Sequence, residues 1–338
     1  MKLQNNISLQ NLNTFGIDVS CKLFCTVSST KEIKRLLVSK EYTKNNVLIL
    51  GGGSNLLFTQ DFNGLIVKNE VKGFETLSEN KHNKIIKVGA GENWHQFVLW
   101  SIKNGLSGVE NMALIPGNVG ASPMQNIGAY GVEAKDVIDK VWAVEIENGK
   151  ELILSNKDCE FQYRNSIFKN DLKNKVIITH VSFNLSKTPK NNTEYGDIKQ
   201  EIKDLGVKVS TESICKAVIN IREKKLPNPD KIGNSGSFFK NPIISSSKFI
   251  NLQQLNPKII GYKISETEIK VAAGWLIEKC GWKGHRKGDA GVHKNQALVL
   301  VNYGKATGKE IITLAKKIQE SVKNKFDIDI HPEVNIIG

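Results

Sequence analysis

The stretch from Ile115 to Gly131 constrains the fold of this chain more than any other part of the sequence. It reads IPGNVGASPMQNIGAYG, and its four glycines and two prolines suit neither a regular helix nor a strand. Apolar residues such as Val119, Ile127 and Tyr130 are interleaved with them, so the stretch is not a solvated linker. A buried irregular segment must find partners for its backbone N–H and C=O groups. We therefore expect either a loop that cradles a large polar cofactor or a glycine-rich structural crossover.

The composition is that of an ordinary soluble globular protein of about two domains. The chain has 338 residues, of which 40% are hydrophobic and 24% charged. No apolar run approaches the ~20 residues that span a bilayer, and the N-terminus lacks a signal peptide. The five cysteines are scattered without the spacing of a zinc site. We expect a cytoplasmic monomer with free thiols, no metal and no membrane contact.

The charge balance is strongly basic, with 47 basic and 34 acidic residues and a net charge of +13. This excess suggests an anionic partner, either nucleic acid or a phosphorylated small molecule. The basic residues are spread out, and no basic block alternates with aromatics as in a single-strand binder, so we expect no nucleic acid. Four of the basic residues are arginines, and the planar guanidinium draws attention to Arg164 and Arg222.

Residue periodicity predicts alternating strands with few helices, which favours an α+β class over a doubly wound sheet. The clearest elements are a helix over 94–103 that ends at Asn104-Gly105 and a hairpin that turns at Asn148-Gly149. Pro227 and Pro229 mark the best domain boundary. Four further helices are expected: one that begins at an N-cap at Thr30, one that begins at Thr211, and two over 270–280 and 309–326. Further strands are expected over 47–50, 65–67, 85–88, 176–183 and 297–301.

A second glycine cluster follows the expected strand over 47–50. Gly51-Gly52-Gly53-Ser54-Asn55 is a glycine turn with small polar residues, a pattern that can form a nest of N–H groups for a pyrophosphate. The spacing is neither G-x-G-x-x-G nor a Walker A motif, which argues against a Rossmann or P-loop domain. From this stretch alone, phosphate binding and a plain turn remain open.

Five motifs follow one another along the chain at compatible intervals. They are GGGSNLL at 51–57, the segment 114–131, YRNSIF at 163–168, GNSGSFFKNP at 233–242 and PEV at 332–334. In this order they resemble the MurB family of UDP-N-acetylenolpyruvoylglucosamine reductases, over nearly the whole chain from about Asn13 to Gly338. The insertion that carries Tyr195-Gly196-Asp197 is similar to the type I branch of that family.

The resemblance implies an α+β chain with a two-part FAD-binding fold of the PCMH type, which is shared with the vanillyl-alcohol oxidase group. It also implies a C-terminal α/β substrate-binding domain. The first FAD-binding subdomain is expected over 1–70, with a C-terminal strand in 327–338 returning to it, and the second over 71–225. The substrate-binding domain is expected over 226–326, and the PCMH-type region covers about 17–187. The stretch 115–131 contains no His or Cys to tether a flavin, so FAD is expected to be non-covalent. The residues implied to hold it are Gly51, Gly52, Gly53, Ser54, Asn55, Ile115, Pro116, Gly117, Asn118, Ser122, Gln125, Asn126, Gly128 and Tyr130.

The implied reaction is the NADPH-dependent reduction of UDP-N-acetylglucosamine enolpyruvate to UDP-N-acetylmuramate, in peptidoglycan synthesis. Arg164 is expected to clamp the substrate carboxylate, and Ser237 to donate a proton to the neighbouring carbon. Glu333 is expected to act as an acid, favoured by burial, or to orient the clamp. The matching substrate-binding residues are Tyr195, Lys225, Asn241 and Gln296.

Two rival functions are compatible with parts of this pattern. One is another FAD oxidoreductase of the same fold that acts on a small hydroxy acid or an alcohol. The other is a basic, non-enzymatic binder of nucleic acid or phosphosugars. A dissociable flavin and NADPH oxidation that depends on the enolpyruvyl substrate would separate the reductase from both.

Overall fold

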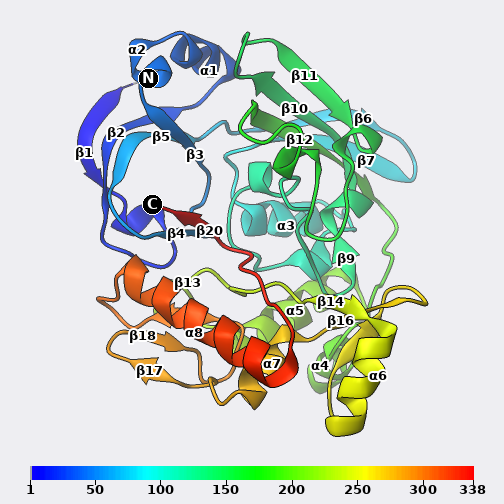
Figure 1. The fold of residues 1–338 in the computed structure, drawn as a ribbon. Helices are drawn as coiled ribbons and strands as arrows, with labels where there is room; N and C mark the ends of the chain where they lie inside the picture. The colour runs from blue at the N-terminus through cyan, green and yellow to red at the C-terminus, as the bar shows by residue number, and fades with distance from the viewer. Residues whose placement is uncertain (1) are drawn as a thin grey trace. The chain divides into compact units, whose positions relative to one another are not determined.

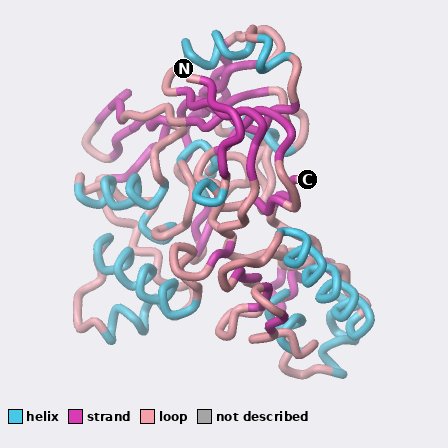
Figure 2. Tube along the Cα trace, turned by 90° about the vertical axis from the view of Figure 1, so that its left-hand side faces the viewer, coloured by secondary structure: helices cyan, strands magenta, loops and turns pink. Residues whose placement is uncertain are grey.

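The chain folds into two units, each assembled from three separate stretches of sequence. The computed structural model describes residues 2–338. The first unit contains the residues up to Ile7, Cys21–Gly52 and Asn63–Lys224; the second contains Ser8–Ser20, Gly53–Phe62 and Lys225–Gly338. Helices and strands occur in both, as Figures 1 and 2 show. The predicted α+β class is confirmed.

The larger sheet of the first unit is antiparallel and has the order β11-β10-β12-β7-β6. Its strands are β6 (Phe74–Glu79), β7 (Asn83–Gly89), β10 (Ile138–Glu145), β11 (Glu151–Ser155) and β12 (Val176–Ser186). β10 and β11 form the predicted hairpin, because Gly149 takes a positive φ of 71° in the turn. The strands predicted over 85–88 and 176–183 are confirmed as parts of β7 and β12.

The smaller sheet of this unit has the order β1-β2-β5-β3, and β3 and β5 run parallel. Its strands are β1 (Leu3–Ser8), β2 (Ser20–Val27), β3 (Asn46–Leu50) and β5 (Phe62–Asn69); the connecting helices are α1 (Thr30–Leu37) and α2 (Lys40–Thr43). The N-cap predicted at Thr30 is wrong by one residue. Ser29 has the extended backbone of a cap, and its hydroxyl accepts the N–H of Glu32.

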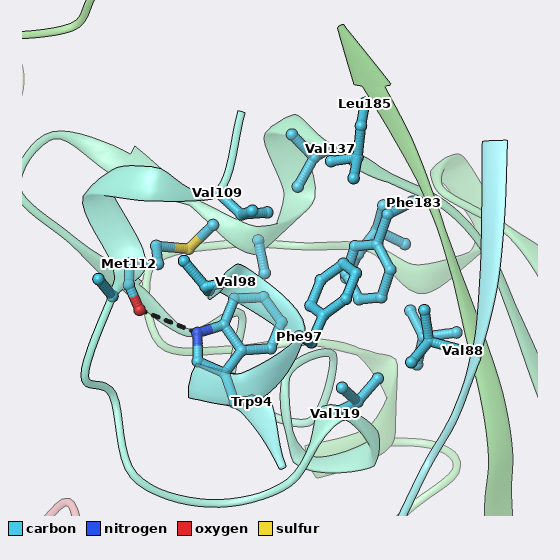
Figure 3. Packing of buried hydrophobic residues seen from close by; sticks show 14 of the residues in the cluster. Val88, Trp94, Phe97, Val98, Val109, Met112, Val119, Val137, Phe183 and Leu185 are labelled. Atoms are coloured by element: carbon cyan, nitrogen blue, oxygen red, sulfur yellow. Dashed lines mark hydrogen bonds between the residues drawn. The ribbon is translucent and has the colours of Figure 1, made fainter. Parts of the chain in front are cut away.

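An aromatic core holds α3 (Trp94–Lys103) against the larger sheet. Trp94, Phe97 and Phe183 are fully buried, and the rings of Phe97 and Phe183 lie 4.6 Å apart. Figure 3 shows this cluster and the bond from Trp94 Nε1 to the carbonyl of Met112, which is 2.9 Å long. The helix predicted over 94–103 is confirmed, and Gly105 ends it with a positive φ of 68°. This packing fixes the first turn of α3 beside the loop that follows Met112.

The first unit is completed by short elements around that loop and by two further helices. They are β8 (Gly128–Ala129), β9 (Val132–Glu133), α4 (Ile198–Asp204) and α5 (Thr211–Lys225), with 3-10 turns at Glu110–Met112, Val119–Ala121, Ala134–Asp136, Lys157–Cys159 and Ile167–Lys169. The helix predicted from Thr211 is therefore confirmed.

The second unit contains three small sheets. Their orders are β13-β19-β18-β17, β14-β16-β15 and the parallel pair β20-β4. The elements are a 3-10 turn at Gln10–Leu12, β4 (Leu56–Phe58), β13 (Gly233–Asn234), β14 (Ile243–Ser245), α6 (Ser246–Leu255), β15 (Gly261–Lys263), β16 (Glu268–Val271), α7 (Ala273–Lys279), β17 (Arg286–Lys287), β18 (Ala290–Val292), β19 (Leu300–Asn302), α8 (Gly308–Phe326) and β20 (Asn335–Ile337).

Two predictions in this unit need correction. The helix expected over 270–280 begins only at Ala273, because residues 268–271 pair with β14 and β15 as β16. The strand expected over 297–301 is β19, which starts three residues later at Leu300. The helix predicted over 309–326 is confirmed as α8.

No helix within residues 2–338 is long and apolar enough to cross a membrane. All five cysteines are unpaired, and Cys21, Cys25, Cys159 and Cys215 are buried. Burial raises the pKa of the Cys159 and Cys215 thiols to about 12, so these cysteines pack as neutral apolar groups.

Candidate active site

Backbone hydrogen bonds hold the first half of the Ile115–Gly131 stretch against the start of α3. The N–H of Trp94 donates to the carbonyl of Gly117 at 3.0 Å, and the N–H of Val119 donates to the carbonyl of Glu92 at 2.8 Å. These bonds satisfy buried backbone groups of an irregular segment, as the sequence required. The segment is therefore a fixed loop and not a flexible linker. We call Ile115–Gly131 the glycine loop below.

The Gly51–Gly52 turn approaches the glycine loop more closely than any side chain would allow. A Cβ atom on Gly52 would lie 2.8 Å from the Cα of Gly117 and 3.0 Å from Oδ1 of Asn118. A side chain at position 52 would therefore clash with the backbone of the glycine loop. The two clusters singled out in the sequence are thus brought side by side within the first unit.

Asn126 fixes the second half of the glycine loop. Its side chain is fully buried and donates to Oε2 of Glu133 at 3.0 Å and to the carbonyl of Gln162 at 3.1 Å. Its Oδ1 accepts the N–H of Lys135 at 2.9 Å. Asn126 therefore joins the loop to the segment that carries Arg164.

Arg164 donates hydrogen bonds to backbone carbonyls of the glycine loop. Its Nη2 donates to the carbonyl of Gly128 at 2.9 Å and its Nη1 to the carbonyl of Asn126 at 3.4 Å. The residue takes a positive φ of 53°, a conformation that residues with a side chain rarely adopt and that often marks a functional position. These bonds set the plane of the guanidinium at the loop.

Arg222 places a second guanidinium in the same unit. It lies on α5, its Nε is buried, and no residue among 2–338 accepts a hydrogen bond from that atom. Burial lowers the pKa of Arg222; the neighbouring Tyr130 opposes this change and the charge of Arg164 adds to it. A buried donor of this kind can serve an acceptor from outside the protein chain, such as an ordered water or a ligand.

The tyrosine-bearing insertion lies on the end of the glycine loop. The rings of Tyr130 and Tyr195 meet edge to face, with centroids 6.3 Å apart. A Cβ atom on Gly131 would lie 3.3 Å from the Cβ of Tyr195. The side chain of Asn111 donates at 3.0 Å to the carbonyls of both Tyr130 and Asn192, and so ties the two segments together. Tyr195 itself remains exposed.

In the second unit, the segments that carry Ser237 and Glu333 are paired by one isolated antiparallel bridge. The N–H of Glu333 donates to the carbonyl of Phe238 at 2.8 Å, and Phe239 forms an antiparallel bridge with Pro332. Phe238 and Phe239 are buried, but Ser237 is exposed and Glu333 is partly exposed. The burial expected to favour an acidic Glu333 is therefore only partial.

The end of the Gly51–Asn55 turn belongs to this second unit. Gly53 has a positive φ of 64°, and a Cβ atom there would lie 2.0 Å from the carbonyl oxygen of Leu12. The side chain of Asn55 donates to the carbonyl of Glu333 at 3.3 Å, and its carbonyl accepts the N–H of Asn335 at 3.1 Å. Asn55 thus supports the strand next to Glu333, a role that the motif did not reveal.

Asn241 and Gln296 meet at the first turn of α7. Oδ1 of Asn241 accepts the N–H of Ala273 at 3.0 Å. A Cβ atom on Gly274 would lie 3.3 Å from Oε1 of Gln296. Lys225, the fourth predicted substrate-binding residue, is the exposed last residue of α5.

His95 is absent from the residues that the motifs single out, yet it contacts the entrance of the glycine loop. Its Nδ1 accepts the N–H of Leu114 at 3.0 Å. The partner is a backbone group 19 residues away, so no side-chain pattern in the sequence reveals the bond. No group of three or more His, Cys, Asp or Glu side chains within residues 2–338 could hold a metal ion.

Two family models match this chain. The first describes an FAD binding domain and covers residues 21–155; the second describes the C-terminal domain of UDP-N-acetylenolpyruvoylglucosamine reductase and covers residues 228–337. A reductase of that name from Flavobacterium johnsoniae is 50% identical over the full length of both chains. The chain belongs to the UDP-N-acetylenolpyruvoylglucosamine reductase family.

Other members of the family match over the same length. The reductases of Amoebophilus asiaticus and Chromobacterium violaceum are 46% and 44% identical, and the matches cover 100% of this chain and 100% and 99% of those proteins. The crystal structure of the reductase MurB from Thermus caldophilus covers both chains completely with a TM-score of 0.70 at 22% identity. This likeness supports the fold, including the FAD-binding part that the motifs predicted.

The family makes the chain a flavin-dependent oxidoreductase with FAD as its cofactor, as predicted. The residues present fit such a group. The matched FAD binding domain contains Gly52, the glycine loop and their close approach, a contact that a side chain at position 52 would obstruct. The buried Nε of Arg222 supplies a donor for a polar acceptor. Which residues hold the flavin stays a prediction.

Proposed function

We propose that this chain reduces the enolpyruvyl group of UDP-N-acetylglucosamine enolpyruvate to give UDP-N-acetylmuramate, a step of peptidoglycan synthesis that serves cell shape and division. The 50% identity to the Flavobacterium johnsoniae reductase carries the proposal, because that match spans every candidate site segment. The rival, a flavin enzyme of the same fold that oxidises a small hydroxy acid or alcohol, has no observation in its favour.

FAD is placed on the glycine loop and the Gly51–Asn55 turn. The support is that both segments lie within the matched FAD binding domain and that the contact between Gly52 and Gly117 brings them together. Glycine-rich turns of this kind can offer backbone N–H groups to a pyrophosphate. When bound there, FAD would supply the hydride-transfer chemistry that links NADPH to the terminal carbon of the enolpyruvyl double bond.

Arg164 is proposed to bind the substrate carboxylate. Hydride addition leaves negative charge on the neighbouring carbon and on its carboxylate, so a cation aimed there stabilises the transition state. The bonds from Arg164 to Asn126 and Gly128 support this role, because they hold the guanidinium in one orientation before substrate arrives. A lysine would carry the charge without the planar pair of donors.

Ser237 is proposed to donate the proton that completes the reaction. A serine hydroxyl is a weak acid, so it serves only where the acceptor is a strongly basic carbanion and water is excluded. Ser237 is exposed in the chain alone, and the proposal therefore requires substrate to cover it. Its neighbour Phe238 is fixed by the bond from Glu333, which holds the Ser237 backbone in place.

Glu333 is proposed to act as an acid or to orient the clamp. Its backbone is held by Phe238, and the amide of Asn55 reaches its carbonyl. Glu333 is partly exposed. The proposal therefore requires that bound substrate bury the carboxylate, because burial favours its protonated form.

The substrate-binding roles of Tyr195, Lys225, Asn241 and Gln296 remain part of the proposal. Tyr195 is exposed on an insertion that rests on Tyr130, a suitable arrangement for a residue that contacts a bound nucleotide. Lys225 is an exposed cation for a diphosphate.

We also propose that the protein works as a monomer in the cytoplasm. One chain supplies all the candidate residues. Its five unpaired cysteines suit a reducing compartment.

An assay of purified protein tests the proposed reaction. The protein should bind FAD that acid denaturation releases, and it should oxidise NADPH only when UDP-N-acetylglucosamine enolpyruvate is present, with UDP-N-acetylmuramate as product. NADPH oxidation driven instead by a small hydroxy acid or alcohol couple, or protein that takes up no FAD, would overturn the proposal.

A further inference from the structure

The residue just before the glycine loop, Leu114, is held by the titratable side chain of His95. Trp94 of α3 bonds the chain on either side, through Nε1 to the carbonyl of Met112 and through its N–H to the carbonyl of Gly117. Between these two anchors the N–H of Leu114 donates to Nδ1 of His95 at 3.0 Å.

Leu114 needs such an anchor because of its backbone. Its φ is +58°, in the left-handed region that a leucine rarely adopts. A conformation of this kind persists only where the surroundings hold it. The left-handed turn at Leu114 sets the direction of the chain from Ile115 onward. Loss of this turn would therefore move the first residues of the glycine loop.

The direction of the bond assigns the protonation of His95. A backbone N–H can only donate, so Nδ1 must carry a lone pair and the proton of the neutral ring lies on Nε2. Protonation of Nδ1 would remove the acceptor and place two donors face to face. The bond therefore exists only with the neutral imidazole.

The charges around His95 come from α5. Burial is the largest cause that lowers the pKa of His95; the cation Arg222 lowers it further, and the carboxylate of Glu223 opposes this. A histidine with a lowered pKa takes up its proton more readily when the fold around it opens. The stabilisation is therefore complete above about pH 6.5 and is lost as the pH falls below that value.

We infer that His95 is a positioning residue for the flavin loop: its neutral ring holds the left-handed turn at Leu114 and so keeps the Ile115–Gly131 backbone in the shape that binds FAD. This inference rests on the proposed placement of FAD on that loop. It goes beyond the proposed reaction, since His95 takes no part in the transfer of hydride or proton.

A pair of variants of nearly equal shape isolates the bond. His95→Asn keeps an acceptor near the position of Nδ1 but cannot titrate, whereas His95→Leu removes the acceptor. FAD binding is measured by flavin fluorescence on the apoprotein of full length, between about pH 5 and 8, with the unfolding midpoint of each apoprotein as a check on folding. His180→Asn is the matched control, because burial also lowers the pKa of His180, which lies on β12 and bonds Thr179.

The expected results differ for each protein. The wild type and His180→Asn should bind FAD several-fold more weakly at the acid end of this range than at the neutral end. The loss should begin only below about pH 6.5, because the pKa of His95 in the folded chain is lowered. His95→Asn should bind within about threefold of the wild type at high pH and lose the pH dependence. His95→Leu should bind about fivefold more weakly at high pH, the value of one lost hydrogen bond, with no further loss in acid.

Gly52→Ala separates failure of this inference from failure of the proposed function. If Gly52→Ala weakens FAD binding while His95→Leu matches the wild type, or His95→Asn keeps the full pH dependence, the loop binds FAD but His95 does not position it. If Gly52→Ala leaves FAD binding unchanged, FAD does not lie on the loop. The proposed placement of FAD and the inference about His95 then both fall.

Discussion

The two glycine-rich segments of this chain are held in place by different means. The glycine loop, Ile115–Gly131, depends on side chains as well as on backbone bonds. Arg164 bonds the carbonyl of Gly128, the side chain of Asn126 bonds Gln162 and Lys135 outside the loop, and His95 bonds the N–H of Leu114 just before it. The segment 233–242 depends on backbone pairing. Gly233 pairs with Asn302, the N–H of Phe238 bonds the carbonyl of Leu298, and the N–H of Lys240 bonds the carbonyl of His331.

The difference bears on how each segment tolerates change. Side-chain substitutions near the glycine loop should alter its shape and its affinity for FAD. The side chain of Ser237 is exposed, so this proposed proton donor can be removed with little effect on the backbone bonds of the segment. Cofactor affinity and chemistry should therefore respond to separate sets of mutations.

Ser237→Ala should have the largest effect, and on turnover alone. Loss of a proton donor in the transition state should lower kcat by about 10²–10⁴-fold. Because Ser237 is exposed and its backbone bonds remain, the free energy of unfolding should change by less than about 0.5 kcal/mol. Steady-state kinetics and urea unfolding measure the two quantities. Ser235→Ala, in the same segment, is the control, and turnover there should stay near the wild-type value.

Asn126→Ala should destabilise the first unit. The substitution leaves the N–H of Lys135 and the carbonyl of Gln162 without the partner that a fully buried side chain supplied. We expect a loss of about 2–3 kcal/mol in the free energy of unfolding, measured by urea denaturation of the apoprotein. The exposed Asn148→Ala should change it by less than about 0.5 kcal/mol. Equal, small changes for both would mean that side chains do not hold the loop.

Gly52→Ala should weaken FAD binding by about tenfold. The new Cβ would meet Gly117 at 2.8 Å, and relief of such overpacking costs about 1–3 kcal/mol. Gly51→Ala is the sharper comparison, because a Cβ there would find its nearest neighbour, the Cβ of Asn118, at an ordinary 3.8 Å. Fluorescence titration should give a clearly smaller loss for Gly51→Ala, and the reverse order would contradict the close approach of the two turns.

Asn241→Ala should give the smallest effect. Removing the acceptor for the N–H of Ala273 should cost about 1 kcal/mol of stability, as for other lost helix caps. Asn241→Asp keeps the acceptor for the N–H of Ala273 and should retain most of the wild-type stability. Thermal unfolding distinguishes the two, and an equal loss in both variants would show that the cap is not the cause.

Local patterns in the sequence predicted much of the fold. The helix over 94–103 and the hairpin at Asn148-Gly149 depend on neighbouring residues, and both are confirmed. The helix expected from Lys270 was wrong at its start because residues 268–271 pair with strands formed by 243–245 and 261–263. An apolar run followed by a helix cannot be divided correctly without knowledge of these distant partners.

The candidate site was predictable only as a set of motifs. The glycine clusters were recognised, but the contact of Gly52 with Gly117 required the fold. His95 was missed because its partner is a backbone N–H. Asn55 was predicted to hold FAD, but its bond to Glu333 was missed because it joins residues 278 positions apart. The individual roles of Arg164, Ser237 and Glu333 stay predictions.

The two half-reactions test the central claim most directly, namely that the glycine loop serves the flavin while the 233–242 segment serves the proton transfer. Rapid mixing under anaerobic conditions follows flavin absorbance, first with NADPH and then with UDP-N-acetylglucosamine enolpyruvate. In Ser237→Ala, flavin reduction by NADPH should stay within about threefold of the wild-type rate, and reoxidation by substrate should slow by at least about 10²-fold. Equal slowing of both steps, or reoxidation at the wild-type rate, would contradict the claim.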